Sequence, residues 1–214
     1  LREACRQTRQ WQHRISTAKP ISISVNLSAK QLMHPSLTSR VREILASTGL
    51  DARNLKLEVT ESTVMEHSET ALRVLNELKA LGVRLSTDDF GTGYSSLSYL
   101  HQFPFDRMKI DRSFIGKMDA DLKSEAIVRT ILILGQNLEI EVVAEGIENE
   151  QQLWQLRSLG CRYGQGYFFS KPVCAEEAEK LLREGLPVDI SLMEAPFVFS
   201  KMDNHRFIEI DEVY

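Results

Sequence analysis

The chain has 214 residues, with 26 lysines and arginines against 30 aspartates and glutamates, and 43% of its residues are hydrophobic. This length can bury one sizeable core, and the net charge of −4 argues against a general binder of nucleic acid or anionic membranes. No apolar run approaches the roughly 20 residues that cross a bilayer. The three cysteines have no C-x-x-C spacing, which indicates a reducing compartment. We therefore expect a cytoplasmic location, although other domains of a parent protein could anchor it to a membrane.

Strands and helices are expected to alternate along the chain. The expected strands cover residues 21–25, 55–59, 83–87, 107–110, 140–144 and 166–169. The expected helices cover about residues 1–15, 36–49, 68–82, 97–100, 124–138, 149–160 and 175–184. Ser36 and Asn149 are the expected caps of two of them. The segment 186–214 has no helical period, and extended segments are expected around 196–199 and 207–210.

Six strands, each followed by a helix at a spacing of roughly thirty residues, predict an α/β fold with a parallel sheet. Both a closed barrel and an open doubly wound sheet fit this pattern. A closed (β/α)8 barrel normally needs eight strands and about 250 residues, so six strands would leave it short at its front. We expect one domain over residues 1–185 and a C-terminal tail over 186–214.

Polar residues gather where the expected strands end. In parallel α/β folds the carboxyl ends of the strands converge on the binding crevice, so these residues can meet although they are far apart in sequence. They are Asn26, Glu58, Glu61, Asp88, Asp89, Lys109, Asp111, Glu145, Glu148 and Gln165.

Such a pocket of carboxylates repels itself unless positive charge compensates it. Oxygen ligands suit Mg²⁺ or Mn²⁺ better than zinc or copper. The adjacent Asp88 and Asp89 could bridge two ions, an arrangement that serves phosphodiester hydrolysis. Lys109 would add charge for a phosphate or orient the attacking water.

Each residue also has a plainer interpretation. A single acid at a strand end is more often a helix cap or a solvated loop residue. Lys109 could have a purely structural role, in an ion pair with Asp111 or Glu145. The glycine-containing loop at 90–97 lacks the lysine of a P-loop and the third glycine of a dinucleotide fingerprint, which weakens mononucleotide-fold interpretations.

Six ordered motifs resemble those of the EAL-domain family. They are residues 24–28 (SVNLS), 57–62 (LEVTES), 88–97 (DDFGTGYSSL), 109–115 (KIDRSFI), 144–148 (AEGIE) and 164–172 (GQGYFFSKP). The resemblance implies a modified TIM barrel and a bacterial phosphodiesterase. Such enzymes use two Mg²⁺ or Mn²⁺ ions to open cyclic di-GMP to linear pGpG.

The same resemblance assigns roles to individual residues. Asn26, Glu58, Asp88 and Asp89 correspond to metal ligands, with Asp89 on the second ion. Glu145 corresponds to a general base or second-metal ligand, Lys109 to the lysine that holds the water and phosphate, and Glu61 to the anchor of the glycine loop. Asp111, Gln165 and Pro172 correspond to residues near the substrate or second metal.

The Glu-Ala-Leu signature that names the family does not occur in the chain. The resemblance places it about one βα unit before Leu1, so we expect a barrel that lacks its first strands, one metal ligand and the arginine after that signature. An open barrel would expose strand edges, which leads us to expect a homodimer, with strand swapping across the gap as one form of it. A sensory or GGDEF domain is an expected neighbour in the parent protein.

Two functional classes follow. The first is a hydrolase that acts on cyclic di-GMP, and the filled set of acidic positions favours it. The second is a catalytically inactive receptor for cyclic di-GMP or a protein-interaction module, which the absence of the signature favours.

Overall fold

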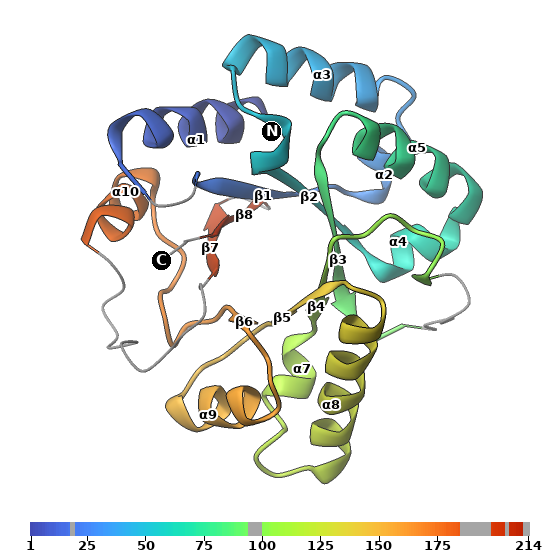
Figure 1. The fold of residues 1–214 in the computed structure, drawn as a ribbon, viewed down its shortest axis with the longest axis vertical. Coiled ribbons are helices and arrows are strands. Elements are labelled where there is room, and N and C mark those ends of the chain that lie inside the picture. The colour runs from blue at the N-terminus through green and yellow to red at the C-terminus, as the bar shows by residue number, and fades with distance from the viewer. Residues whose placement is uncertain (18–19, 94–99, 185–197, 204–205, 212–214) are drawn as a thin grey trace.

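The computed structural model describes residues 1–17, 20–93, 100–184, 198–203 and 206–211. Its centre is a curled eight-stranded sheet in the order β6-β5-β4-β3-β2-β1-β8-β7, with helices outside it (Figure 1). The first six strands are β1 (Ser22–Asn26), β2 (Leu55–Thr60), β3 (Arg84–Phe90), β4 (Arg107–Ile110), β5 (Glu141–Ala144) and β6 (Tyr163–Gly164).

The pairing within this sheet decides between the two candidate folds. From β1 to β6, every neighbouring pair is parallel and follows chain order. A doubly wound sheet reverses its strand order at a switch point, whereas a barrel of βα units adds each strand beside the last. The six parallel strands therefore form part of a TIM-like barrel, as the family resemblance implies.

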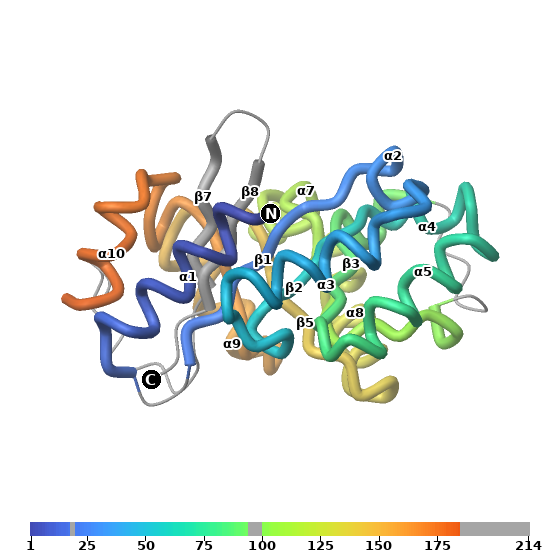
Figure 2. The backbone as a smooth tube through the Cα atoms, turned by 90° about the horizontal axis from the view of Figure 1, so that it is seen from above, coloured from blue at the N-terminus to red at the C-terminus, as the bar shows by residue number. Residues whose placement is uncertain are grey.

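The helices cover the outside of the curl (Figures 1 and 2). Those that precede β3 are α1 (Arg2–Arg14), α2 (Ala29–Leu32), α3 (Leu37–Thr48), the 3₁₀ turn η1 (Ala52–Asn54), α4 (Glu61–Glu66) and α5 (Ser68–Ala80). Those that follow it are α7 (Arg112–Ile115), α8 (Leu122–Asn137), α9 (Glu150–Ser158) and α10 (Ala175–Glu184). Among the described residues, no helix is long and apolar enough to cross a bilayer.

Strand β2 illustrates how the sheet separates its two faces. Leu55, Leu57 and Val59 are buried members of the main apolar core, and they alternate with Lys56 and Glu58. Those two charged residues are also buried. Because successive side chains of a strand point to opposite faces, the apolar set and the charged set lie on different faces. The interior of the curl is therefore polar.

One of the two expected caps is wrong. Asn149 caps α9, where its side-chain oxygen accepts the amide of Gln152 at 2.9 Å. Ser36 precedes α3 but makes no side-chain cap, and its hydroxyl lies 2.9 Å from Nδ1 of His34 instead. Helix α2, which is not among the expected helices, begins with a capping box between Ser28 and Gln31.

The expected strand over 166–169 is also wrong. The strand is Tyr163–Gly164, and residues 166–169 form a turn in which the amide of Phe169 donates to the carbonyl of Gly166. A Cβ at Gly166 would lie 2.1 Å from the carbonyl oxygen of Ile147. The backbone of Ile147, in the loop after β5, therefore packs directly against Gly166. We infer that this contact is the reason why β6 ends at Gly164. Of the expected helix over 97–100, residues 97–99 lie outside the described part.

Two further strands, β7 (Val198–Asp203) and β8 (Arg206–Asp211), form an antiparallel hairpin within the C-terminal segment. Strand β8 pairs antiparallel with β1. The chain's own hairpin therefore covers β1, and β6 and β7 are the end strands of the sheet in the described part of the chain.

Candidate functional site

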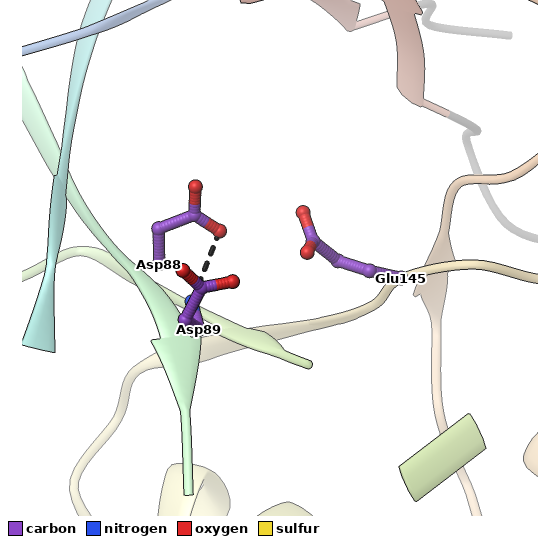
Figure 3. A group of neighbouring side chains, drawn as sticks. All are labelled: Asp88, Asp89 and Glu145. Atoms are coloured by element: carbon purple, nitrogen blue, oxygen red, sulfur yellow. Dashed lines mark hydrogen bonds between the residues drawn. The ribbon is translucent and has the colours of Figure 1, made fainter. Parts of the chain in front are cut away.

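Acidic side chains converge at the carboxyl ends of β3 and β5. Carboxylate oxygens of Asp88, Asp89 and Glu145 lie within 4.8 Å of one another, and all three side chains are partly buried. Figure 3 shows Asp88 and Asp89 side by side at the end of β3, with the carboxylate of Glu145 facing them. This arrangement concentrates negative charge where a cation can bind.

Lys109 supplies positive charge to the same group. Its Nζ lies 2.5 Å from Glu145, 3.0 Å from Glu58 and 3.5 Å from Asp88. The lysine is 3% exposed and Glu58 is 1% exposed. Because buried charges need compensation, the ammonium stabilises three carboxylates that would otherwise repel one another.

A bulge explains how two adjacent aspartates serve one site. The pairing of β3 with β4 shifts between Thr87 and Phe90, so Asp88 and Asp89 together face the single residue Lys109. Asp89 has a φ of 55°, in the left-handed region. In a regular strand these two side chains would point to opposite faces, and the bulge with its turned backbone removes that alternation.

The neighbours of Asp89 perturb its acidity. Burial raises the pKa of Asp89, and the charges of Asp88 and Asp111 raise it further, while Lys109 acts in the opposite direction. Asp111 also caps α7 by accepting the amide of Ser113 at 2.9 Å. The structure thus brings Asp111 next to the cluster and gives it a structural bond as well.

Asn26 and Glu58 lie on the neighbouring strands. Asn26 is the last residue of β1, and it stands opposite Glu58 of β2 in the parallel register. One strand further, Thr60 of β2 stands opposite Asp88 of β3. Amide and carboxylate oxygens from three consecutive strands therefore end at one edge of the sheet.

Glu61 reaches the loop that follows β3. It is the first residue of α4 and is 3% exposed. Its Oε2 accepts the amide of Gly91 at 3.1 Å, and a Cβ at Gly93 would lie 3.5 Å from its other oxygen. Glu61 therefore holds the start of this loop against α4, while residues 94–99 of the loop lie outside the described part.

Gln165 lies beside Glu145, to whose Oε1 its side-chain amide donates at 3.1 Å. The backbones around them are interlocked: Gln165 donates to the carbonyl of Ala144, and Ile147 donates to that of Gln165. Pro172 is half-buried between β6 and α10. Among the described residues, the hydrogen bonds and ion pairs of the site do not include it.

A second polar group, which is not among the expected site residues, lies on the interior face of the same sheet. Arg107 pairs with Glu141 at 2.8 Å and lies over the ring of Tyr163, whose hydroxyl donates to Glu141 at 3.2 Å. Burial works against the charge of Glu141, but Arg107 and Lys56 outweigh it and lower the pKa of the carboxyl. The alternation of charged with apolar residues in β2 and β4 was the available signal.

Comparison with known proteins identifies the fold. The family model described as "EAL domain" matches residues 1–172. MucR of Pseudomonas aeruginosa, a bifunctional diguanylate cyclase/cyclic di-GMP phosphodiesterase, is 45% identical over 177 residues, 83% of this chain and 26% of MucR. NbdA of the same organism, a cyclic di-GMP phosphodiesterase, is 43% identical over 183 residues, 86% of this chain and 23% of NbdA. The chain thus spans about a quarter of these relatives.

Solved structures agree. The MucR phosphodiesterase in complex with cyclic di-GMP has a TM-score of 0.79 at 45% identity and covers 83% of this chain and 71% of its own. Klebsiella pneumoniae BlrP1 with manganese and cyclic di-GMP has a TM-score of 0.73 at 31% identity, covering 81% of this chain and 43% of its own. The chain belongs to the EAL-domain family.

Proposed function

We propose that the chain is the core of a cyclic di-GMP phosphodiesterase that opens its substrate to linear pGpG. The observation that carries the proposal is the convergence of Asp88, Asp89 and Glu145 around the buried Lys109. MucR and NbdA, which carry this activity in their names, support the substrate class.

The donor set fits hard divalent cations, in particular two Mg²⁺ or Mn²⁺ ions. Asn26, Glu58, Asp88 and Asp89 are the proposed ligands, and all of them offer oxygen atoms. When bound, the ions would neutralise phosphate charge and activate the attacking water. The BlrP1 complexes with manganese and with calcium support a divalent-metal site in the family.

The other residues of the site are proposed to transfer a proton, to contact a phosphate or to fix the loop after β3. Lys109, within 3.5 Å of three carboxylates, is the proposed contact for the water and a phosphate oxygen. Glu145 would accept a proton from the attacking water or bind the second ion, and Gln165 orients it through their hydrogen bond. Glu61 holds the loop after Asp89.

Substrate contacts are proposed for three residues on the rim. Asp111 lies next to Asp89, and Gln165 lies next to Glu145. Pro172 follows them in the segment after β6. We propose that the phosphodiester lies between the carboxyl ends of β3 and β5, beside Lys109.

Further proposals concern the setting of this domain. We propose a cytoplasmic homodimer, with exchange of a strand segment as one form of it. In a longer parent protein, a sensory or GGDEF domain would adjoin it. A receptor without catalysis is the second candidate, and it differs from the enzyme by the absence of product.

Glu145→Gln tests the proposal, because it removes a charge and a proton acceptor while it keeps the shape of the side chain. We expect it to lower the rate of pGpG formation about 100-fold or more while cyclic di-GMP still binds. Glu43→Gln, an exposed change on α3, is the matched control and should leave the rate unchanged. Equal rates in both variants would contradict the role of Glu145.

A further inference from the structure

Interior side chains join strands β4, β5 and β6 twice, and the candidate site contains one of the two junctions. We call it the upper row. It consists of Lys109 on β4, Glu145 directly after β5 and Gln165 directly after β6. The carboxylate of Glu145 lies 2.5 Å from Nζ of Lys109 and accepts the side-chain amide of Gln165 at 3.1 Å. One acid thus links a cation on one side with a neutral donor on the other.

A lower row repeats this arrangement with the first residue of each strand, Arg107 of β4, Glu141 of β5 and Tyr163 of β6. Oε2 of Glu141 accepts Nε and Nη2 of Arg107 at 3.2 and 2.8 Å, and Oε1 accepts the hydroxyl of Tyr163 at 3.2 Å. The guanidinium also lies 5.2 Å from the centre of the Tyr163 ring. Arg107 is 4% exposed, and a buried charge-assisted pair of this kind is a strong tie.

The two rows lie on the same face of the sheet. Their members are two residues apart along β4 and β6 and four residues apart along β5, and side chains at these spacings point to one face. The amide of Glu145 donates to the carbonyl of Ile110, and that of Gln165 donates to the carbonyl of Ala144. The parallel pairing therefore continues from the lower row to the upper row.

Backbone pairing holds these three strands over a short distance. Strands β4 and β5 pair over four positions, and β5 and β6 pair over two. In the described part of the sheet β6 is an end strand, with β5 as its neighbour. The lower row adds side-chain ties between the same strands. Such ties matter for catalysis, because a shift of about 1 Å between reacting groups can lower a rate about 100-fold.

We propose that Arg107, Glu141 and Tyr163 are positioning residues that hold Lys109 and Glu145 at the separation that turnover requires. This role rests on the proposed function, in which Lys109 and Glu145 act on the attacking water. It deepens that function, because the lower row would act through the three strands and not through contact with substrate or metal.

Glu141→Gln and Tyr163→Phe in the full chain test this role. Glutamine keeps the shape of Glu141 but offers one oxygen in place of two, and phenylalanine keeps the ring of Tyr163 but removes its hydroxyl. In Mn²⁺ we expect kcat for pGpG formation to fall about 10-fold in each variant, while KM for cyclic di-GMP and the affinity for Mn²⁺ stay within about twofold of the wild type. Tyr163→Phe leaves every charge in place, so it carries the test if Glu141→Gln does not fold.

The outer helices offer a matched control. Glu77 of α5 also accepts an arginine and a hydroxyl, Arg73 at 2.7 Å and Thr38 at 2.9 Å. Glu77→Gln and Thr38→Val therefore remove the same kinds of bond away from the interior of the sheet. Both variants should keep kcat within about twofold of the wild type.

Crystal structures of the wild type and the variants give a readout that needs no turnover. The distance from Nζ of Lys109 to the carboxylate of Glu145 should lengthen by about 0.5 Å or more in the lower-row variants and stay unchanged in the controls. A kcat within twofold of the controls in Glu141→Gln and Tyr163→Phe, or an unchanged distance, would overturn the positioning role. A wild type that forms no pGpG would contradict the proposed function instead, and the distances would still decide the role of the lower row.

Discussion

At the scale of single residues, Asp89 combines a left-handed backbone with a carboxyl whose pKa is raised, first by burial and then by Asp88 and Asp111. Because the folded chain holds this proton more tightly than the unfolded chain does, the stability that it contributes is present at acid pH and is lost as the pH rises through the folded pKa. A cation bound there would reverse this loss.

The substitution Asp89→Asn tests the effect of the Asp89 charge on stability and on metal binding. Asparagine tolerates a positive φ and removes the repelling charge, so the metal-free variant should unfold about 2 °C higher than the wild type at pH 7 while Mn²⁺ binding weakens at least tenfold. Thermal unfolding in EDTA and Mn²⁺ calorimetry measure the two effects. A variant that binds Mn²⁺ like the wild type would show that Asp89 is not a ligand.

Metal binding should also release protons in mildly acidic buffer. The raised pKa keeps part of Asp89 protonated at a pH where an ordinary aspartate is ionised, and a cation displaces that proton. Calorimetric titration with Mn²⁺ in two buffers of different ionisation enthalpy counts the protons. Identical heats in both buffers across the acidic range would contradict this prediction.

Glu61 tests the link between α4 and the loop after β3. Glu61→Ala removes the acceptor of the Gly91 amide. It should lower the free energy of unfolding by about 1–3 kcal/mol and should also lower the turnover rate. Glu61→Gln keeps an oxygen acceptor and should recover part of both. Denaturant unfolding and product assays measure them, and a fully active alanine variant would remove Glu61 from the site.

At the scale of elements, local sequence patterns predict strands in which charged and apolar residues alternate, and helices that have clear start and stop residues. Strand β4 and helix α10 have the expected bounds. The end of β6 depends on the close contact of Gly166 with the backbone of Ile147, which belongs to another segment of the chain. The Ser36 hydroxyl bonds to the side chain of His34 and not to the first turn of the helix. The first failure comes from a contact between separate segments, and the second from a hydrogen bond to a residue two positions earlier, which competes with capping.

Gly166→Ala tests that crossing. Its Cβ would meet the carbonyl of Ile147 at 2.1 Å, so the loops that carry Glu145 and Gln165 must separate. We expect a loss of about 1–3 kcal/mol or more and weaker metal binding. Gly116→Ala, at a right-handed position at the end of α7, should change stability by less than about 1 kcal/mol. Denaturant unfolding compares the two, and equal effects would contradict the tight crossing.

At the scale of the whole molecule, the alternation of strands and helices in the sequence predicts the parallel sheet. The convergence of strand ends in such folds also predicts that Glu58, Asp88, Lys109 and Glu145 meet, and their ion pairs confirm this. The bulge that lets Asp88 and Asp89 share a site could not be predicted, since it depends on the pairing of β3 with β4. Extended segments were expected around 196–199 and 207–210, and β7 and β8 lie there, but the pairing of β8 with β1 was not expected, since the two strands are almost the whole chain apart.

We propose that this acidic cluster hydrolyses cyclic di-GMP. The most direct measurement is chromatographic separation of cyclic di-GMP and linear pGpG after incubation with the full chain in Mn²⁺, beside a matched sample in EDTA. We expect pGpG in Mn²⁺ and none in EDTA. Cyclic di-GMP that binds but stays intact in Mn²⁺ would contradict the enzyme and favour a receptor.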